Sequence, residues 1–211
     1  MALLGVLLYA ASSAAAASLV VKVQQRDGKP LAGAVLTAGS ESLHLPPAAP
    51  THVSVDQLDL AFVPDVVIIP VGSTISFPNS DAVSHQVYSF SSTLRFQLPL
   101  YRGKPYPPVT FDKPGVVTLG CNIHDNMLAY VIVTSEPFFG RTDAKGEWIA
   151  PNLPAGSYRV QLWHPLLNEP ANQLERVVEV AAGPDRSEVT LKLAHALRPL
   201  PLKSHPHSWD Y

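Results

Sequence analysis

The chain has 211 residues, which is enough for one or two domains with a substantial hydrophobic core. Only 15% of its residues are charged, the formal net charge is −2, and it has no Lys/Arg cluster of the kind that neutralises phosphates, so no nucleic-acid partner is expected. The 21 prolines and 12 glycines separate short runs of Val, Ile and Leu, which predicts many short strands joined by turns.

Residues 1–17 are typical of a secretory signal peptide. After Met1 they are apolar or small, and they end in a run of alanines that supplies an A-x-A cleavage pattern. Their apolar part is too short for a spanning helix, and the early Lys or Arg of most such signals is missing. We therefore expect a periplasmic protein whose mature chain has no stable membrane insertion, the alternative being a buried N-terminal helix.

Strand patterns begin directly after this segment. Two apolar runs, 19–23 and 31–36, flank a turn that contains Asp27, Gly28 and Pro30. A Pro- and Ala-rich stretch at 45–50 then predicts a domain boundary.

The next region consists of short β-branched runs punctuated by Gly and Pro, which predicts a β-sandwich or barrel. Its predicted strands lie at 53–55, 60–64, 66–70, 73–77, 86–90, 115–120 and 128–133. Further turns and strands are predicted from 142 to 193, and the Pro- and His-rich residues 195–211 are predicted to be a flexible tail.

The loop between the runs 115–120 and 128–133 carries the rarest side chains of the chain. Cys121 is the only cysteine, Met127 is the only methionine besides Met1, and His124 lies midway in the spacing C-x2-H-x2-M. A lone Cys or Met is usually a core residue, but a thiolate, an imidazole and a thioether at this spacing form a soft ligand set that suits copper. His85, just before another predicted strand, offers the second imidazole of the blue-copper arrangement.

Competing chemistries account for these residues less well. Zinc does not use a thioether, which leaves Met127 without a role, and a Cys nucleophile lacks an evident third group that orients its base. A multicopper oxidase or nitrite reductase needs further His-rich ligand sets, of which only His205-Pro206-His207 in the tail has the form. We therefore expect no catalytic centre.

Residues 60–133 resemble a cupredoxin. The pieces "LAFVP", "PVGS" and "FPN" are similar to the opening half of plastocyanin, and the short loop between the Cys and Met is similar to that of amicyanin. With "VYSF" and "LGCNIHD", the full pattern resembles bacterial chains commonly labelled methylamine utilization protein.

The resemblance implies one type 1 copper ion and a role for each ligand. Cys121 would be the thiolate ligand, His85 and His124 the imidazoles, and Met127 the axial thioether. It also implies that Asn79 ties the His85 segment to the Cys121 loop, and that electrons pass through the exposed edge of His124.

A second resemblance covers residues 19–35 and 142–193. "DGKPLAGAV" and "TDAKGEWIAPNLPAGSYRV" resemble the two ends of a carboxypeptidase regulatory-like, transthyretin-like β-sandwich. Because these pieces are usually adjacent, we expect the cupredoxin to be inserted into a loop of the other sandwich. The alternative is that residues 19–36 supply the first strands of the cupredoxin itself.

The expected fold class is therefore all-β, with a cupredoxin Greek-key sandwich inserted into a transthyretin-like sandwich. The expected division is a signal peptide at 1–17, a split carboxypeptidase regulatory-like sandwich at 18–45 and 136–194, a cupredoxin at 46–135 and a tail at 195–211. The expected function is that of a periplasmic blue copper protein, not an enzyme, that carries single electrons between redox partner proteins. The alternatives are copper storage or delivery without electron transfer, and a structural or interaction module.

Overall fold

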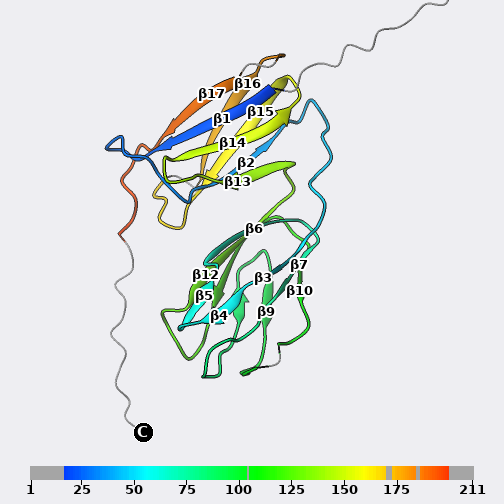
Figure 1. Cartoon of the computed structure of the whole chain (residues 1–211), viewed down its shortest axis with the longest axis vertical. Coiled ribbons are helices and arrows are strands. Elements are labelled where there is room, and N and C mark those ends of the chain that lie inside the picture. The colour runs from blue at the N-terminus through cyan, green and yellow to red at the C-terminus, as the bar shows by residue number, and fades with distance from the viewer. Residues whose placement is uncertain (1–16, 104, 170–172, 184–185, 200–211) are drawn as a thin grey trace, which may run out of the picture.

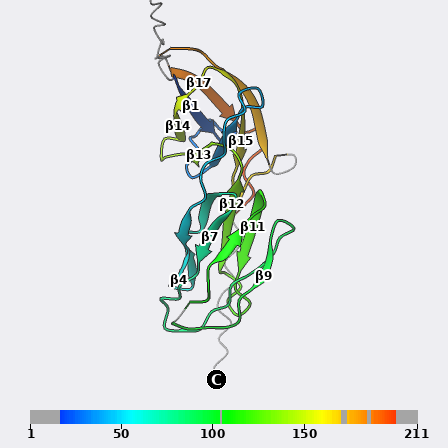
Figure 2. The same ribbon diagram turned by 90° about the vertical axis from the view of Figure 1, so that its right-hand side faces the viewer.

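The structure, a computed structural model, describes residues 17–103, 105–169, 173–183 and 186–199. Within these ranges the chain forms strands, turns and loops and has no helix, so the expectation of an all-β sandwich fold is confirmed. No helix that could cross a membrane is found in the described part of the chain. Figures 1 and 2 show the strands in two groups, one above the other along the longest axis.

The upper group, which we call the terminal sandwich, combines strands from both ends of the described chain. One of its sheets has the order β14-β1-β17 and the other has the order β13-β2-β15-β16. The strands are β1 (Ala17–Gln24), β2 (Val35–Gly39), β13 (Phe138–Arg141), β14 (Glu147–Leu153), β15 (Gly156–Trp163), β16 (Leu174–Val180) and β17 (Arg186–Lys192).

The lower group, the central sandwich, holds the strands between β2 and β13. Its five-stranded sheet has the order β6-β12-β11-β8-β9, its three-stranded sheet has the order β10-β7-β3, and β4 and β5 form a hairpin. The strands are β3 (His52–Ser54), β4 (Asp56–Leu58), β5 (Ala61–Val63), β6 (Val66–Pro70), β7 (Ser73–Ser76), β8 (Tyr88–Phe90), β9 (Arg95–Gln97), β10 (Val109–Phe111), β11 (Gly115–Gly120) and β12 (Leu128–Thr134).

Each sandwich buries its own hydrophobic core, because alternate side chains of a strand point to the same face. In β15, Tyr158, Val160 and Leu162 point inward onto Leu19 and Val21 of β1 in the core of the terminal sandwich. The core of the central sandwich is a separate cluster that includes Phe77, Phe111, Val117, Leu119 and Val131.

The first two strands pair with strands a hundred or more positions away in the sequence. β1 lies antiparallel to β14, with Val21 opposite Trp148, and parallel to β17, with Val21 opposite Val189. β2 lies between β13 and β15. Residues 17–39 therefore contribute to the sheets of the terminal sandwich, and the domain boundaries at 45/46 and 135/136 stay a prediction.

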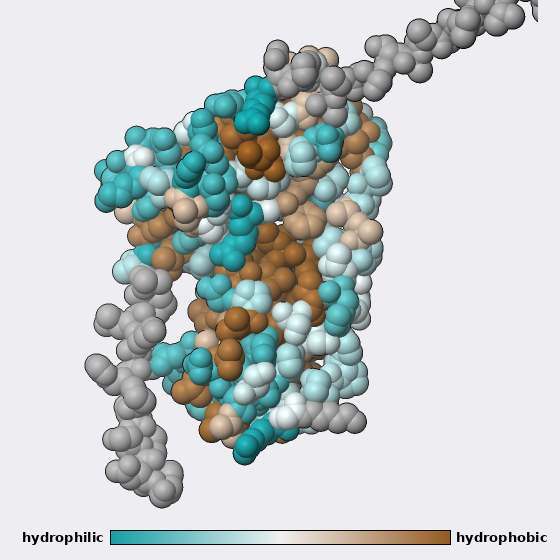
Figure 3. All heavy atoms as spheres, in the orientation of Figure 1, coloured by the Kyte–Doolittle hydropathy of each residue, from teal (hydrophilic) through white to brown (hydrophobic). Residues whose placement is uncertain are grey.

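A smaller apolar cluster joins the two sandwiches. It consists of Val35, Val66 and Ile132, with Tyr130 and Trp163 packed against it and their rings 5.1 Å apart. Figure 3 shows hydrophobic residues gathered near this junction on the visible face. The junction is small beside the two main cores, so most hydrophobic burial lies within each sandwich.

The predicted signal peptide and the predicted tail lie partly outside the residues that the structure describes. Residues 1–16 lie outside the described residues, and so do 200–211 with His205 and His207. Ala17, predicted to be the last residue of the signal, is buried in β1 and lies opposite Leu153.

A buried carboxylate holds His195, the first residue of the predicted flexible tail, and Ala194 just before it. Glu169 accepts hydrogen bonds from the backbone of Ala194 and His195 at 2.8 and 3.0 Å, and from the His195 ring at 3.1 Å. Burial raises the pKa of Glu169, but the hydrogen bonds from His195 and Ala194 outweigh burial and hold the pKa below its ordinary value. Residues 194–195 are therefore fastened to the loop after β15.

We expect Glu169→Gln to loosen this segment, because hydrogen bonds to a charged acceptor are stronger than those to an amide. Amide hydrogen exchange at Ala194 and His195 should become roughly tenfold faster, the equivalent of about 1.5 kcal/mol. Since the folded pKa is depressed, the stabilisation is present above the unfolded pKa of about 4.3 and is lost as the pH falls through the folded pKa. Glu179→Gln, on the exposed edge strand β16, is the control; equal exchange rates in both variants and the parent chain would contradict the assignment.

Candidate metal centre

The loop of residues 121–127 is a tight connection between two paired strands. Gly120, the last residue of β11, lies opposite Leu128, the first residue of β12, so both ends of the loop are held together. A hydrogen bond of 3.0 Å from the Met127 backbone N–H to the His124 carbonyl closes a turn inside the loop. This brings a thiol, an imidazole and a thioether into one hairpin end.

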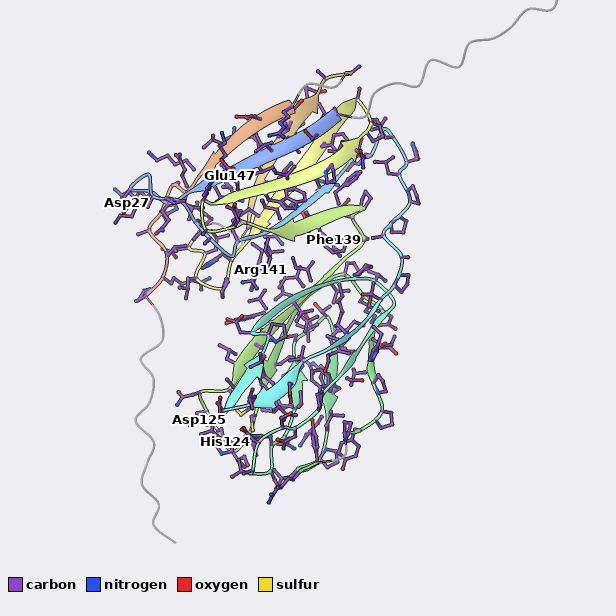
Figure 4. All side chains as sticks on the ribbon, viewed as in Figure 1. Asp27, His124, Asp125, Phe139, Arg141 and Glu147 are labelled. Carbon is purple, nitrogen blue, oxygen red and sulfur yellow. The ribbon has the colours of Figure 1, made fainter. Side chains whose placement is uncertain are left out.

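The burial pattern of the loop separates these three side chains from their neighbours. Cys121 and Met127 are buried and His124 is half-buried, whereas the residues between them are exposed. Figure 4 shows His124 and Asp125 at the end of the central sandwich that faces away from the terminal sandwich. The loop therefore turns its three soft donors toward the core.

His85 reaches this loop from the connection that leads into β8. Tyr88 of β8 lies opposite Gly120 of β11, which sets the segment before β8 across from the loop. His85 is further held by two backbone hydrogen bonds of 3.0 and 2.9 Å with Tyr101. The absence of a side chain at Gly120 leaves room for the end of the Tyr88 side chain, which would lie 2.8 Å from a Cβ there.

Three donor atoms converge at this point. His85 Nδ1 lies 3.0 Å from His124 Nδ1 and 3.9 Å from Cys121 Sγ, and His124 Nδ1 lies 3.7 Å from Cys121 Sγ. All three atoms lie within 4.8 Å of one another, and His85 and Cys121 are buried. This is the group of potential metal ligands found among the described residues.

The spacing fits one metal ion. Donors bound at usual metal–nitrogen and metal–sulfur lengths of about 2.0 to 2.3 Å in a trigonal plane lie about 3.5 to 3.7 Å apart. The observed separations of 3.0, 3.7 and 3.9 Å bracket these values, so small side-chain rotations suffice. One thiolate with two imidazoles, and a thioether buried in the same core cluster at Met127, suits copper better than a hard cation.

A carboxylate lies behind one of the imidazoles. Asp81 Oδ2 is 2.6 Å from His85 Nε2. An ionised carboxylate only accepts hydrogen bonds, so Nε2 carries a proton, and Nδ1 is the ring nitrogen whose lone pair can bind a metal. Burial raises the pKa of Asp81, but hydrogen bonds from the Leu60 backbone, the His85 ring and the Asp59 backbone outweigh it and hold the pKa below its ordinary value.

The other imidazole lies nearer the surface. Burial lowers the pKa of His124, and the positive charge that His85 can carry lowers it further. A lowered pKa favours the uncharged imidazole of His124, and this is the form that can bind a metal.

Asn79 holds the His85 segment, although its partners differ from the expected one. Its side-chain amide donates to the carbonyls of Val83 and Tyr101 at 3.0 and 2.9 Å, and its carbonyl accepts from the Asp81 backbone at 3.0 Å. These bonds fold the turn between β7 and β8 on itself and onto Tyr101, rather than onto the Cys121 loop.

Tyr101 supports the same segment from inside the core. Its hydroxyl donates to the Phe77 carbonyl oxygen at 2.5 Å. The same hydroxyl oxygen accepts from the Gln57 side-chain amide, also at 2.5 Å. Burial raises the pKa of Tyr101 to about 12, so the hydroxyl stays protonated near neutral pH. The Tyr101 hydroxyl therefore keeps the proton that it donates to the Phe77 carbonyl.

We expect Tyr101→Phe to lower the free energy of unfolding by about 1–3 kcal/mol, because the buried Gln57 amide and Phe77 carbonyl lose a partner. The apolar ring remains, so the fold and the metal ligands should stay in place. Urea unfolding measures the loss, and Tyr106→Phe, at a half-exposed ring that packs against Tyr101, is the control. Equal stability of the two variants would contradict this account.

The structure thus brings His85, Cys121 and His124 together and buries Met127 in the same core cluster; their roles as ligands stay a prediction. Sequence reasoning missed Asp81, Gln57 and Tyr101. Asp81 lies in a turn, where a spacing of four residues implies no contact with His85, so no sequence signal pointed to it.

Comparisons with known proteins give structural neighbours only. No protein-family model matches the sequence, and no curated protein sequence matches it. Similar structures include a Cu-containing nitrite reductase from Thermus scotoductus SA-01, with 27% identity, a TM-score of 0.38, and coverage of 55% of this chain and 28% of that chain. This chain thus spans little more than a quarter of the nitrite reductase.

Two smaller proteins are also similar. A purple cupredoxin from Nitrosopumilus maritimus has 22% identity and a TM-score of 0.35 over 39% of this chain and 99% of its own. A mutant of amicyanin in its reduced state has 23% identity and a TM-score of 0.37 over 47% of this chain and 98% of its own. The resemblance of the terminal sandwich to a carboxypeptidase regulatory-like domain stays a prediction.

Proposed function

We propose that this chain is a type 1 copper protein that carries single electrons between redox partner proteins in the periplasm. The observation that supports it best is the convergence of His85 Nδ1, Cys121 Sγ and His124 Nδ1 within 4.8 Å at one end of a β-sandwich. When bound, copper alternates between Cu(II) and Cu(I) and so takes up and releases one electron. We assign Cys121, His85 and His124 as its ligands and Met127 as the weak axial ligand.

The surroundings of these residues suit electron transfer better than substrate chemistry. The strand pairing at Gly120 and the backbone bonds of His85 hold the ligands in place, so little has to move when the charge of the site changes. His85 is 0% exposed and Cys121 is 3% exposed, which leaves His124 as the half-exposed ligand of the three. Because two of the three ligands are buried and only the imidazole edge of His124 reaches the surface, we propose a carrier rather than an enzyme.

The rim around His124 suits transient contact with a partner. Ile123, within the loop, and Leu128, directly after it, are 51% and 43% exposed. These two apolar side chains can be buried against a partner protein, with the exposed carboxylate of Asp125 in the same loop beside them, and electrons then cross at the imidazole edge. The partner proteins themselves are proposed only as a class.

Titration of the purified mature protein with Cu(II) tests the proposal. One equivalent should produce an intense thiolate-to-copper absorption in the visible range, and voltammetry should give a reversible one-electron response. A protein that stays colourless contradicts the proposal. A coloured protein without an electrochemical response that hands copper to an acceptor chelator favours the alternative of copper delivery.

A further inference from the structure

The hairpin β4–β5 is linked to His85, one of the proposed ligands, by the carboxylate of Asp81, which lies outside the hairpin. Its two strands face each other with Leu58 opposite Ala61, so Asp59 and Leu60 form a two-residue turn between them. In Figure 4 this cyan hairpin extends toward the end of the central sandwich where His124 and Asp125 are labelled. None of its residues belongs to the ligand set.

The turn has an unusual backbone for its sequence. Asp59 has φ of 54° and Leu60 has φ of 57°, the left-handed region at both central positions that type I′ hairpin turns require. Asn-Gly or Asp-Gly usually occupies these positions, and a bulky residue such as leucine is an outlier there. An outlier of this kind persists where its surroundings hold it, and such outliers cluster at functional sites.

Asp81 is the group that this turn holds. The backbone N–H groups of Asp59 and Leu60 donate to the two carboxylate oxygens of Asp81 at 2.7 and 3.0 Å. The oxygen that accepts from Leu60 also lies 2.6 Å from His85 Nε2. The Asp81 side chain is 11% exposed and that of His85 is 0% exposed, so the pair is shielded from water.

We propose that the Asp59-Leu60 turn and Asp81 together act as a positioning device for the copper site, which fixes the ring of His85 and places a negative charge behind it. This rests on the proposed function. With the Asp81 oxygens anchored by two backbone donors, the carboxylate cannot rotate away, and the His85 proton stays on Nε2. Nδ1 is then always the free donor, without a tautomer change on metal binding.

The same arrangement sets the direction of a redox effect. A carboxylate hydrogen-bonded to the second nitrogen of a ligand imidazole makes that ligand more basic. Both the added basicity and the nearby negative charge favour Cu(II) over Cu(I). Asp81 therefore lowers the reduction potential of the site.

Asp81→Asn tests this without a change of shape. The neutral amide should shift the Cu(II)/Cu(I) equilibrium toward Cu(I) by roughly tenfold, which is about 59 mV toward a higher potential for a one-electron couple. Asp56→Asn is the matched control, because Asp56 lies on β4 and accepts from the backbone and hydroxyl of Ser80, next to Asp81. It removes the same charge without a contact to a ligand and should shift the equilibrium much less.

Two variants at Leu60 distinguish the role of its backbone N–H group from that of its side chain. Leu60→Gly keeps the N–H group and suits a positive φ, so the potential should stay that of the parent protein. Leu60→Pro removes the N–H and cannot adopt this φ, so it should move the potential in the direction of Asp81→Asn. A purely structural role of Asp81 would change stability and leave the potential where it was.

The outcomes separate this inference from the proposed function. If the parent protein shows no copper absorption, the proposed function fails and this inference fails with it. If the absorption is present and Asp81→Asn shifts the potential no more than Asp56→Asn, only the inference is overturned. Should Asp81→Asn not fold, proton NMR of the parent Cu(I) protein decides: a strongly downfield His85 Nε2–H signal supports the hydrogen bond, and a signal at the usual position overturns it.

Discussion

Cys121→Ser is expected to abolish the intense visible absorption of the copper-loaded protein. Serine is almost the same size, but its hydroxyl is not deprotonated near neutral pH and offers a hard oxygen in place of a soft thiolate. Cu(II) affinity should fall by more than the factor of about 10–100 that loss of an outer-sphere partner causes. Absorption spectroscopy and competition with a chelator measure both effects, and circular dichroism verifies that the variant is folded.

Two further variants show whether the effect is specific. Met127→Leu conserves volume in the core and should keep the absorption while it changes the band positions and raises the potential, since an axial thioether tunes blue-copper sites. His52→Ala removes an exposed histidine bonded to Thr74 and Ser76 and should leave the spectrum unchanged. An unaltered spectrum in Cys121→Ser would refute the assignment of the thiolate ligand.

Val21→Asp is expected to unfold the terminal sandwich and spare the copper site. Val21 is 0% exposed on β1, between β14 and β17. A buried carboxylate without a partner costs several kcal/mol, a large part of the roughly 5–15 kcal/mol that stabilises a domain. The core of the central sandwich shares no residue with the core around Val21, so its copper absorption should persist.

Val177→Asp is the matched control, because the same substitution is made at a position 61% exposed on β16. It should change the free energy of unfolding by no more than about 0.5 kcal/mol. The measurement is circular dichroism together with visible absorption during thermal unfolding. If Val21→Asp loses both signals in one transition, the two sandwiches unfold as one unit and the division at 45/46 and 135/136 is wrong. In the spared case, a small fall in the melting temperature of the copper site is expected, since the junction around Ile132 is lost.

Most strands could be predicted from the sequence because their signals are local. The β-branched runs before and after the loop of Cys121 correspond to β11 and β12, and the run at 66–70 corresponds to β6. Four strands were missed: β4, β9, β10 and β13. Each is only three or four residues long, too short for an alternation of apolar and polar residues to stand out.

Strand partners, by contrast, depend on contacts between distant parts of the chain. The resemblance of the first and last pieces to one sandwich suggested that they meet. The parallel register of β1 on β17, with Leu19 opposite Ser187, follows from which faces the sandwich has to bury. No local pattern contains this information.

The candidate site shows the same division. The sequence by itself determined that Cys121, His124 and Met127 lie within one turn of each other, because seven residues between two strands leave no other arrangement. It offered His85, one of eight histidines, as the second imidazole because His85 lies just before a predicted strand, and the resemblance to a cupredoxin gave the same residue. The convergence of His85 with the loop, and the carboxylate of Asp81 behind it, were decided by the tertiary structure. The pairing of Tyr88 with Gly120 sets the His85 segment beside the loop. The hydrogen bonds from the Asp59-Leu60 turn hold the carboxylate of Asp81. Both are contacts between residues more than twenty positions apart in the chain.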